Sequence, residues 1–183
     1  MMTLSNRIII LLLCFSTICA GASAQIITLG GWVNHYPGES LGPNGNSFFD
    51  LPEVQQPLQK LLPKTEYNNL VRDYGMQAPI HVVGNLLVVI VCKQHWCPDE
   101  NAFAIFGLND KSIVVMFYDD TDGKKQETAT KCFSTGPTIA SLPDIIKEDF
   151  LDRHIMRMSD KELLPDNLWL NNIACKGQSE RIR

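Results

Sequence analysis

The sequence predicts an α+β fold: a single antiparallel β-sheet of about five strands, arranged as a meander and flanked by a few short helices. Several apolar runs of strand length follow one another between residues 80 and 133, and turn-forming residues separate them. The connections between these runs are short, which favours antiparallel pairing of successive strands. Segments with helical spacing lie before and after this region, so we expect helices to flank the sheet rather than to alternate with its strands.

Residues 1–24 have the layout of a secretory signal peptide. Arg7 precedes a short apolar run, and Ala22-Ser23-Ala24 forms a small-x-small cleavage site. The apolar run is shorter than the roughly 20 residues that a membrane-spanning helix needs. We therefore expect export to the periplasm, cleavage after Ala24, and no membrane insertion of the mature chain.

Export changes how the composition is interpreted. The 183-residue sequence carries a formal charge of −4, and residues 1–24 contain one base and no acid, so the mature chain carries −5. An acidic chain lacks the basic stripe of a nucleic-acid-binding protein, and we expect no nucleic-acid partner. Four cysteines remain after cleavage, and an oxidising compartment favours disulfides among them, in any of three connectivities. They are Cys92, Cys97, Cys132 and Cys175.

The first segment of the mature chain, residues 25–47, has no sustained period and is dense in Gly, Pro and Asn. This composition predicts a loop-rich, loosely held N-terminal arm, with Trp32 and Tyr36 as the side chains that would pin part of it to a surface. We expect a core domain over residues 48–158, followed by a C-terminal extension over residues 159–183.

Helical signals open the core domain. Asp50 and Glu53 have the spacing of a capping box, and apolar residues then recur every three or four positions. Because Pro57 and Pro63 interrupt this run, we expect two short helices rather than one long helix.

The strongest pattern is the series of strands. Gly84-Asn85 separates two apolar runs and predicts a tight hairpin turn. The run after this turn is apolar on both faces, which indicates a central strand covered by helices. The last run alternates only weakly, as expected for a more exposed strand. The predicted strands span residues 80–83, 86–91, 102–108, 112–118 and 125–133.

Another helix is expected after the sheet, with Ser141 as its N-cap. A short helix before Pro165 and a docked tail, anchored by Trp169 and Leu170, should follow. The buried face of the helix after Ser141 is marked by Ile145, Ile146, Phe150, Leu151 and Ile155.

The most unusual feature is the loop Cys92-Lys93-Gln94-His95-Trp96-Cys97, which joins two apolar strands. Cysteines five apart can close a small ring if the backbone turns sharply. A Cys92–Cys97 disulfide would constrain the four residues between them before any partner arrives, which lowers the entropy cost of binding. The loop displays a cation, an imidazole and an indole, and no acid, so we expect it to enter a partner that is acidic and concave.

Other interpretations of the loop stay open. A zinc site using Cys92, Cys97 and His95 would need a fourth ligand and reduced thiols. Catalysis by one of these cysteines with His95 would need a free thiolate, which export disfavours. A stabilised hairpin with an incidental exposed histidine is the simplest structural alternative.

The acidic turn Asp119-Asp120 with Asp122 is the other candidate for chemistry. Its carboxylates suggest the acid pair of a glycoside hydrolase, which needs a defined separation across a cleft. In a turn before Gly123, however, such residues usually solvate and cap the chain. We therefore expect no catalytic residue, no bound cofactor and no metal site.

The loop resembles the Cys-Lys/Glu-x-His-x-Cys loop of the Ivy family, the bacterial inhibitors of vertebrate lysozyme. The segment from Val71 to Gly75, and the order and spacing of the strands on both sides of the loop, also resemble that family. The resemblance runs from about Phe48 to about Met158. This sequence departs from the family at Trp96, where Asp or Asn is common.

The resemblance implies a periplasmic, non-catalytic inhibitor of C-type lysozyme that plugs the active-site cleft with this loop. It implies that His95 contacts the two catalytic carboxylates; Lys93 would add attraction to the acidic cleft, and Trp96 would fill a sugar subsite. Animal C-type lysozymes are typically basic, which suits an acidic inhibitor. Family members can be dimers, so a homodimer is plausible.

Two parts of the sequence keep further questions open. The family core does not explain the tail that carries Cys175, and we expect a Cys132–Cys175 disulfide to tie this tail back. Trp96 keeps open an alternative function, a periplasmic immunity or binding protein against a different peptidoglycan-cleaving enzyme. A small secreted hydrolase would require intrinsic turnover, for which the sequence offers no credible catalytic set.

Overall fold

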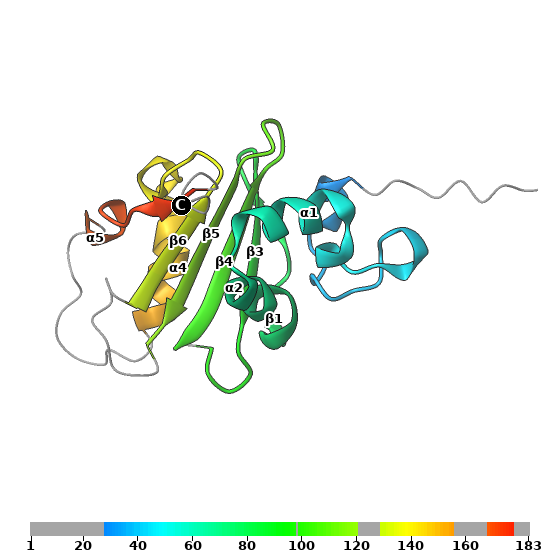
Figure 1. Ribbon diagram of the computed structural model, residues 1–183, viewed down its shortest axis with the longest axis horizontal. Helices are drawn as coiled ribbons and strands as arrows, with labels where there is room; N and C mark the ends of the chain where they lie inside the picture. The colour runs from blue at the N-terminus through cyan, green and yellow to red at the C-terminus, as the bar shows by residue number, and fades with distance from the viewer. Residues whose placement is uncertain (1–27, 98, 121–128, 156–167, 178–183) are drawn as a thin grey trace, which may run out of the picture.

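The protein forms a single seven-stranded sheet in the part of the chain that the computed structural model describes, residues 28–97, 99–120, 129–155 and 168–177 (Figure 1). The strands are β1 (Met76–Gln77), β2 (His81–Val83), β3 (Leu86–Cys92), β4 (Glu100–Gly107), β5 (Ile113–Asp119), β6 (Thr130–Ser134) and β7 (Cys175–Lys176). Their order is β1-β3-β4-β5-β6-β7, and β2 pairs with β3 on the same side as β1. All pairs are antiparallel except β6 with β7. The predicted α+β class and the meander from β2 to β6 are confirmed.

Helices lie on both faces of this sheet, with α4 on one face and α1 and α2 on the other (Figure 1). The α-helices are α1 (Pro52–Leu61), α2 (Lys64–Asn68), α4 (Asp144–Ile155) and α5 (Leu168–Asn171). Short turns of 3-10 helix are η1 (Leu29–Trp32), η2 (Pro43–Gly45), η3 (Phe48–Asp50) and η5 (Ile139–Ser141), and η4 (Asn69–Asp73) is a π-helical turn that follows α2.

The two faces of the sheet bury separate apolar clusters, and β3 contributes to both. Leu87 and Val89 point to the side of α1 and the arm, whereas Val88 and Ile90 point to the side of α4. This alternation explains why the sequence of β3 is apolar at every position. The prediction of a strand covered on both faces is therefore confirmed, although β3 lies one position from the edge rather than in the middle.

The N-terminal arm is held far more firmly than its Gly- and Pro-rich sequence predicts. Trp32 and Phe48 are fully buried, and their ring centroids lie 5.5 Å apart in an edge-to-face contact. The backbone N–H of Asn34 donates to the carbonyl of Ile80 at 2.7 Å. Tyr36, expected to help pin the arm, is exposed instead. Two aromatic side chains therefore fix a segment whose local sequence has no regular pattern.

Both predicted N-caps are wrong, because 3-10 turns use the capping side chains. Helix α1 begins at Pro52, and Asp50 accepts a hydrogen bond from the Ser47 hydroxyl at 2.6 Å, which closes η3. Helix α4 begins at Asp144, while the Ser141 hydroxyl donates to the carbonyl of Thr138 at 2.7 Å in η5. Short polar side chains readily bond to nearby backbone in turns, and here that local bond is formed one turn before the helix.

Two further details of the helices differ from the prediction. Helix α1 continues through Pro57 and ends at Leu61. Of the two prolines, only Pro63 lies at the break between α1 and α2. A proline inside a helix costs about 3 kcal/mol, but burial of the apolar face of α1 against the sheet contributes about 1.5–3 kcal/mol per large side chain. In α4, Ile146 and Phe150 are buried as expected, whereas Ile145 faces solvent.

The C-terminal part of the described chain is docked onto the sheet. Leu170 is fully buried, and Cys175 in β7 forms a disulfide with Cys132 in β6, across which the two Cα atoms are 4.4 Å apart. This is the disulfide predicted to tie back the tail. The strands β1 and β7, each two residues long, were not predicted because they are too short to show a period.

Several predicted features lie outside the described residues. They are the signal peptide (1–24), residues 125–128 of the fifth predicted strand, the short helix before Pro165, and the end of the C-terminal extension (178–183). No helix in the described ranges has the length and apolar character required to cross a membrane.

Candidate functional site: the loop between β3 and β4

The loop predicted to carry function is closed by a disulfide between Cys92 and Cys97, whose Cα atoms are 4.8 Å apart. Cys92 is the last residue of β3, and β4 begins three residues after Cys97. The long, buried pair β3 and β4 therefore supports the loop from both sides. All four residues inside the ring, Lys93 to Trp96, are exposed.

A tight turn places the imidazole at the tip of this loop. The N–H of Trp96 donates to the carbonyl of Lys93 at 3.0 Å, which closes a four-residue turn. Its third residue, His95, has a φ of 67°, in the left-handed region. Glycine or asparagine is preferred at this position of a turn with one positive φ. A histidine there costs backbone energy, and such strain is concentrated at functional sites.

The backbone of Trp96 is the anchor of the loop. Its carbonyl accepts hydrogen bonds from the N–H groups of Asp99 at 2.8 Å and Glu100 at 2.7 Å. The N–H of Lys93 donates to the carbonyl of Glu100 at 3.0 Å, which extends the β3–β4 ladder into the loop. The indole of Trp96 itself remains exposed. The structure thus presents an aromatic ring to solvent from a fixed backbone.

Two residues that support the loop were missed in the sequence analysis. The buried side chain of Asn101 donates to the carbonyl of Cys97 at 3.0 Å. Glu100 accepts a hydrogen bond from the ammonium group of Lys93 at 2.6 Å. The only sequence signal for Asn101 was an amide next to an apolar strand. The ammonium group of Lys93 already has a partner within the chain, Glu100.

Carboxylates gather behind Glu100 on the side of the sheet that α2 covers. Glu100 and Asp119 are directly paired between β4 and β5. Burial of the Tyr74 phenol, and then the negative charges of Glu100, Asp119, Asp73 and Glu66, raise the pKa of Tyr74 well above its usual range. Tyr74 is therefore neutral at physiological pH, and it is buried as part of the apolar core.

The structure does not favour the chemical alternatives for these residues. Both sulfur atoms of the loop are bonded to each other, so neither Cys92 nor Cys97 is a free thiolate for zinc or for nucleophilic attack. In the acidic turn, Asp120 accepts a hydrogen bond from the Tyr118 hydroxyl at 3.3 Å, and its N–H donates to the carbonyl of Asp99. Asp122 lies outside the described residues. Within the described ranges, no cluster of three or more His, Cys, Asp or Glu could hold a metal ion.

A separate cavity of about 810 Å³ opens at the other end of the sheet. It lies between η1, α1 and the turn from β4 to β5, and its walls include Leu29, Phe106 and Ile113. Antiparallel pairing puts this turn at the end of β4 opposite the loop. None of the predicted site residues lines this cavity.

One comparison with known protein families matches the part of the chain that contains the loop. A family model described as inhibitor of vertebrate lysozyme (Ivy) matches residues 53–149. The match contains the whole loop and the strands β1 to β6, and it leaves out the arm and the tail with Cys175. No curated protein and no solved structure matches the chain significantly.

Proposed function

Because the chain belongs to the Ivy family of inhibitors of vertebrate lysozyme, we propose that it inhibits a C-type lysozyme by inserting the loop Cys92–Cys97 into the active-site cleft. The observation that carries this proposal is the exposed, disulfide-closed loop with His95 in a strained turn at its tip. A loop that is rigid before binding loses little conformational entropy when it enters a cleft. The protein acts in this proposal as a plug, with no turnover of its own.

The chemistry of a lysozyme cleft fits an imidazole. Such a cleft holds two carboxyl groups, one protonated and acting as the acid, the other ionised. The two ring nitrogens of His95 can form a hydrogen bond with each, and the bond to the ionised group is charge-assisted. Trp96, exposed beside it, would occupy a sugar subsite through its flat apolar face.

Electrostatics supports a basic target. The mature chain, without residues 1–24, carries a formal charge of −5, and opposite net charges accelerate association at low salt. Lys93 is the cation of the loop and is paired with Glu100 at 2.6 Å; in this proposal it adds attraction to the acidic cleft. We propose that residues 1–24 direct export, that cleavage follows Ala24, and that the inhibitor protects the cell wall from the periplasm.

The proposal is tested with a cell-wall lysis assay using egg-white lysozyme, with and without the purified mature protein. The wild-type protein should stop lysis, and the His95→Ala variant should remain folded and lose most of the inhibition. Gln56→Ala, an exposed glutamine of α1 outside the loop, is the control and should inhibit normally. Unchanged inhibition by His95→Ala would refute the plug model.

A second function is favoured by one observation. Trp96 is a large exposed aromatic residue beside His95, where the family often has Asp or Asn. This side chain suits a target other than animal lysozyme, and we keep as the alternative a periplasmic immunity or binding protein against a different peptidoglycan-cleaving enzyme. That protein would leave egg-white lysozyme active and would bind a bacterial hydrolase tightly. Sedimentation of the purified chain decides whether the protein is a monomer or a homodimer.

A further inference from the structure

Some of the exposed apolar side chains lie in the loop or on the edge of the sheet that leads to it. The large hydrophobic residues exposed in the described ranges are Tyr36 (47%), Met76 (48%), Val82 (38%), Trp96 (46%) and Ile145 (60%). Single exposed apolar residues are normal on a protein surface. Here, however, Trp96 lies in the loop, Met76 lies at its base, and Tyr36 lies on the arm that runs along the same edge of the sheet. We call Tyr36 and Met76 the flanking patch.

Strand pairing places Met76 at the loop. Met76 in β1 is directly paired with Cys92, the residue that begins the disulfide ring. Directly paired residues of antiparallel strands project on the same side, with their Cβ atoms about 5 Å apart. The exposed side chain of Met76 is therefore adjacent to the disulfide that carries the loop.

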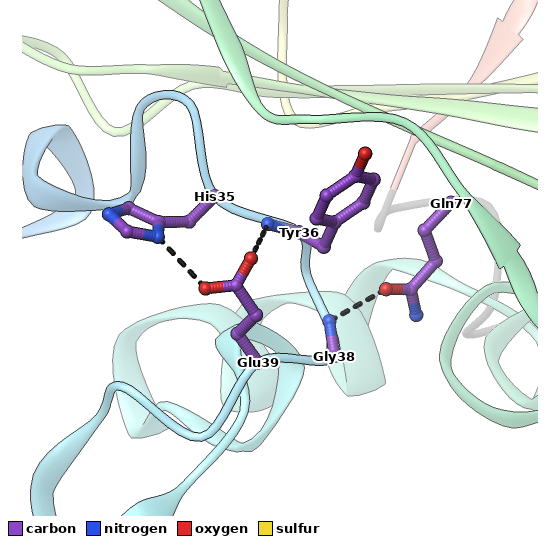
Figure 2. A network of polar contacts seen from close by, with 5 residues as sticks. All are labelled: His35, Tyr36, Gly38, Glu39 and Gln77. Atoms are coloured by element: carbon purple, nitrogen blue, oxygen red, sulfur yellow. Dashed lines mark hydrogen bonds and ion pairs between the residues drawn. The ribbon is translucent and has the colours of Figure 1, made fainter.

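The arm brings Tyr36 to the same edge. Ile80 exchanges backbone hydrogen bonds with Asn34 and His35, and the N–H of Gly38 donates to the side chain of Gln77 at 2.8 Å. The arm thus follows the edge from Ile80 towards β1 and the loop. A Cβ at position 38 would lie 2.9 Å from the side-chain amide oxygen of Gln77, so the glycine lets the arm approach this side chain closely. Figure 2 shows Tyr36 on the arm beside Gly38, whose N–H bonds to Gln77.

The backbone around Tyr36 is fixed by Glu39. The Glu39 carboxylate accepts hydrogen bonds from the N–H of Tyr36 at 2.8 Å and from the ring of His35 at 2.9 Å (Figure 2). These two bonds lower the pKa of Glu39, so it carries its negative charge at neutral pH. In Figure 2 the phenol ring of Tyr36 points away from this carboxylate. The arm therefore presents an ordered aromatic ring next to a fixed negative charge.

The loop alone is too small to form a stable interface. Stable protein interfaces involve about 20–30 residues and about 800 Å² on each partner, whereas the disulfide ring encloses four residues. Surface beside the loop must then contact the target around its cleft. Tyrosine and methionine are enriched in the buried centres of interfaces, and the charge of Glu39 suits a basic partner.

From these observations we infer that Tyr36 and Met76 form a second contact surface for the protein whose cleft receives the loop, a basic C-type lysozyme. This inference rests on the proposed function and extends it to the arm, which lies outside the residues matched by the family model. The loop determines where the target binds, and the flanking patch contributes apolar contact beside the cleft.

The test compares the affinities of single alanine variants for egg-white lysozyme, measured by surface plasmon resonance. Tyr36→Ala and Met76→Ala should each weaken binding about 5- to 30-fold, as expected for interface side chains that contribute measurably to affinity. Val82→Ala, on β2 at the far end of the same edge, and Ile145→Ala, on α4, also remove exposed apolar side chains and should change the affinity less than about twofold. All four positions are exposed, so circular dichroism should show intact folds.

The outcomes separate this inference from the proposed function. If the wild-type chain binds lysozyme, and Tyr36→Ala and Met76→Ala bind as tightly as the two controls do, the flanking patch is not a contact surface. If the wild-type chain does not bind lysozyme, the proposed function and this inference are both overturned. Equal weakening by all four variants would indicate a general effect on the fold and would also contradict the inference.

Discussion

At His95 the backbone conformation lowers the stability of the fold, whereas the side chain is proposed to provide inhibition. Its φ of 67° lies in a region that costs an ordinary residue about 1–2 kcal/mol and costs glycine almost nothing. We predict that His95→Gly raises the free energy of unfolding by up to about 1 kcal/mol and abolishes inhibition. Urea denaturation combined with the lysis assay measures both effects. A His95→Gly variant that is clearly less stable would show that the imidazole supports the fold rather than the target contact.

The side chain of Asn101 in β4 is expected to hold the second half of the loop in place. Asn101→Ala leaves the carbonyl of Cys97 without its amide donor, and such a loss in a buried position costs about 1–3 kcal/mol. The variant should also inhibit more weakly, because the second half of the ring loses a fixed point. Asn109→Ala, in an exposed turn, is the control and should leave both unfolding and inhibition unchanged. If Asn101→Ala is destabilised but inhibits fully, the amide has only a structural role.

At this scale the sequence reveals some site residues and hides others. The loop and His95 could be predicted, because cysteine spacing is a local signal that needs no knowledge of the fold. The roles of Glu100 and Asn101 depend on which atoms of the loop meet β4, and that is decided by the backbone path after Cys97. Trp32 and Tyr36 were both expected to pin the arm; the buried Trp32 does so, whereas Tyr36 is exposed, because tertiary packing decides which of two nearby rings enters the core.

Among the elements, the arm makes the strongest prediction. Trp32 packs edge-to-face on Phe48, which in turn contacts Phe106 of the sheet at 5.5 Å. Trp32→Ala should therefore lower the free energy of unfolding by about 3–5 kcal/mol. Trp96→Ala removes an equally large but exposed ring and should change stability by less than about 0.5 kcal/mol. Equal effects of the two variants in urea denaturation would mean that the arm is not part of the core.

Element prediction succeeded where a long pattern exists. The hairpin of β2 and β3, and the strands β4 and β5, follow apolar runs that dominate any local preference. The edges of the helices could not be predicted, because Asp50 and Ser141 form bonds within preceding 3-10 turns. Ile145 shows the same limit: Ile145 and Ile146 both fit a helical stripe near the start of α4, and only packing against the sheet decides that Ile146 is the buried one.

For the whole molecule, the two disulfides should have separable effects. The Cys132–Cys175 bond closes a segment with a sequence separation of 43 and attaches the tail to the sheet. Replacing both cysteines by alanine should cost about 2–4 kcal/mol of stability and leave inhibition intact. Replacing Cys92 and Cys97 should have the opposite profile. The sequence separation of this pair is only 5, so losing the bond costs less stability. Inhibition should fall strongly, because the loop is no longer held closed. Thermal unfolding and the lysis assay on both double variants decide this.

An effect of both disulfides on inhibition would extend the target surface to the tail. If loss of the tail disulfide also abolished inhibition in a protein that remains folded, then the tail itself would belong to the target surface. The loop lies at the end of β3 and β4, whereas β7 pairs only with β6, so the structure gives the two bonds no shared element.

The divided edge beside β3 has a consequence for solubility. A long, flat edge strand exposes a row of free backbone groups that can join the sheet of another copy and start aggregation. Here that edge consists of a two-residue and a three-residue strand, separated by a segment with Pro79, and the arm bonds to both backbone groups of Ile80. The exposed side chains of Tyr36 and Met76 therefore stand on an edge that offers no continuous template. Copies of the chain can keep an apolar patch in contact with water and still remain apart.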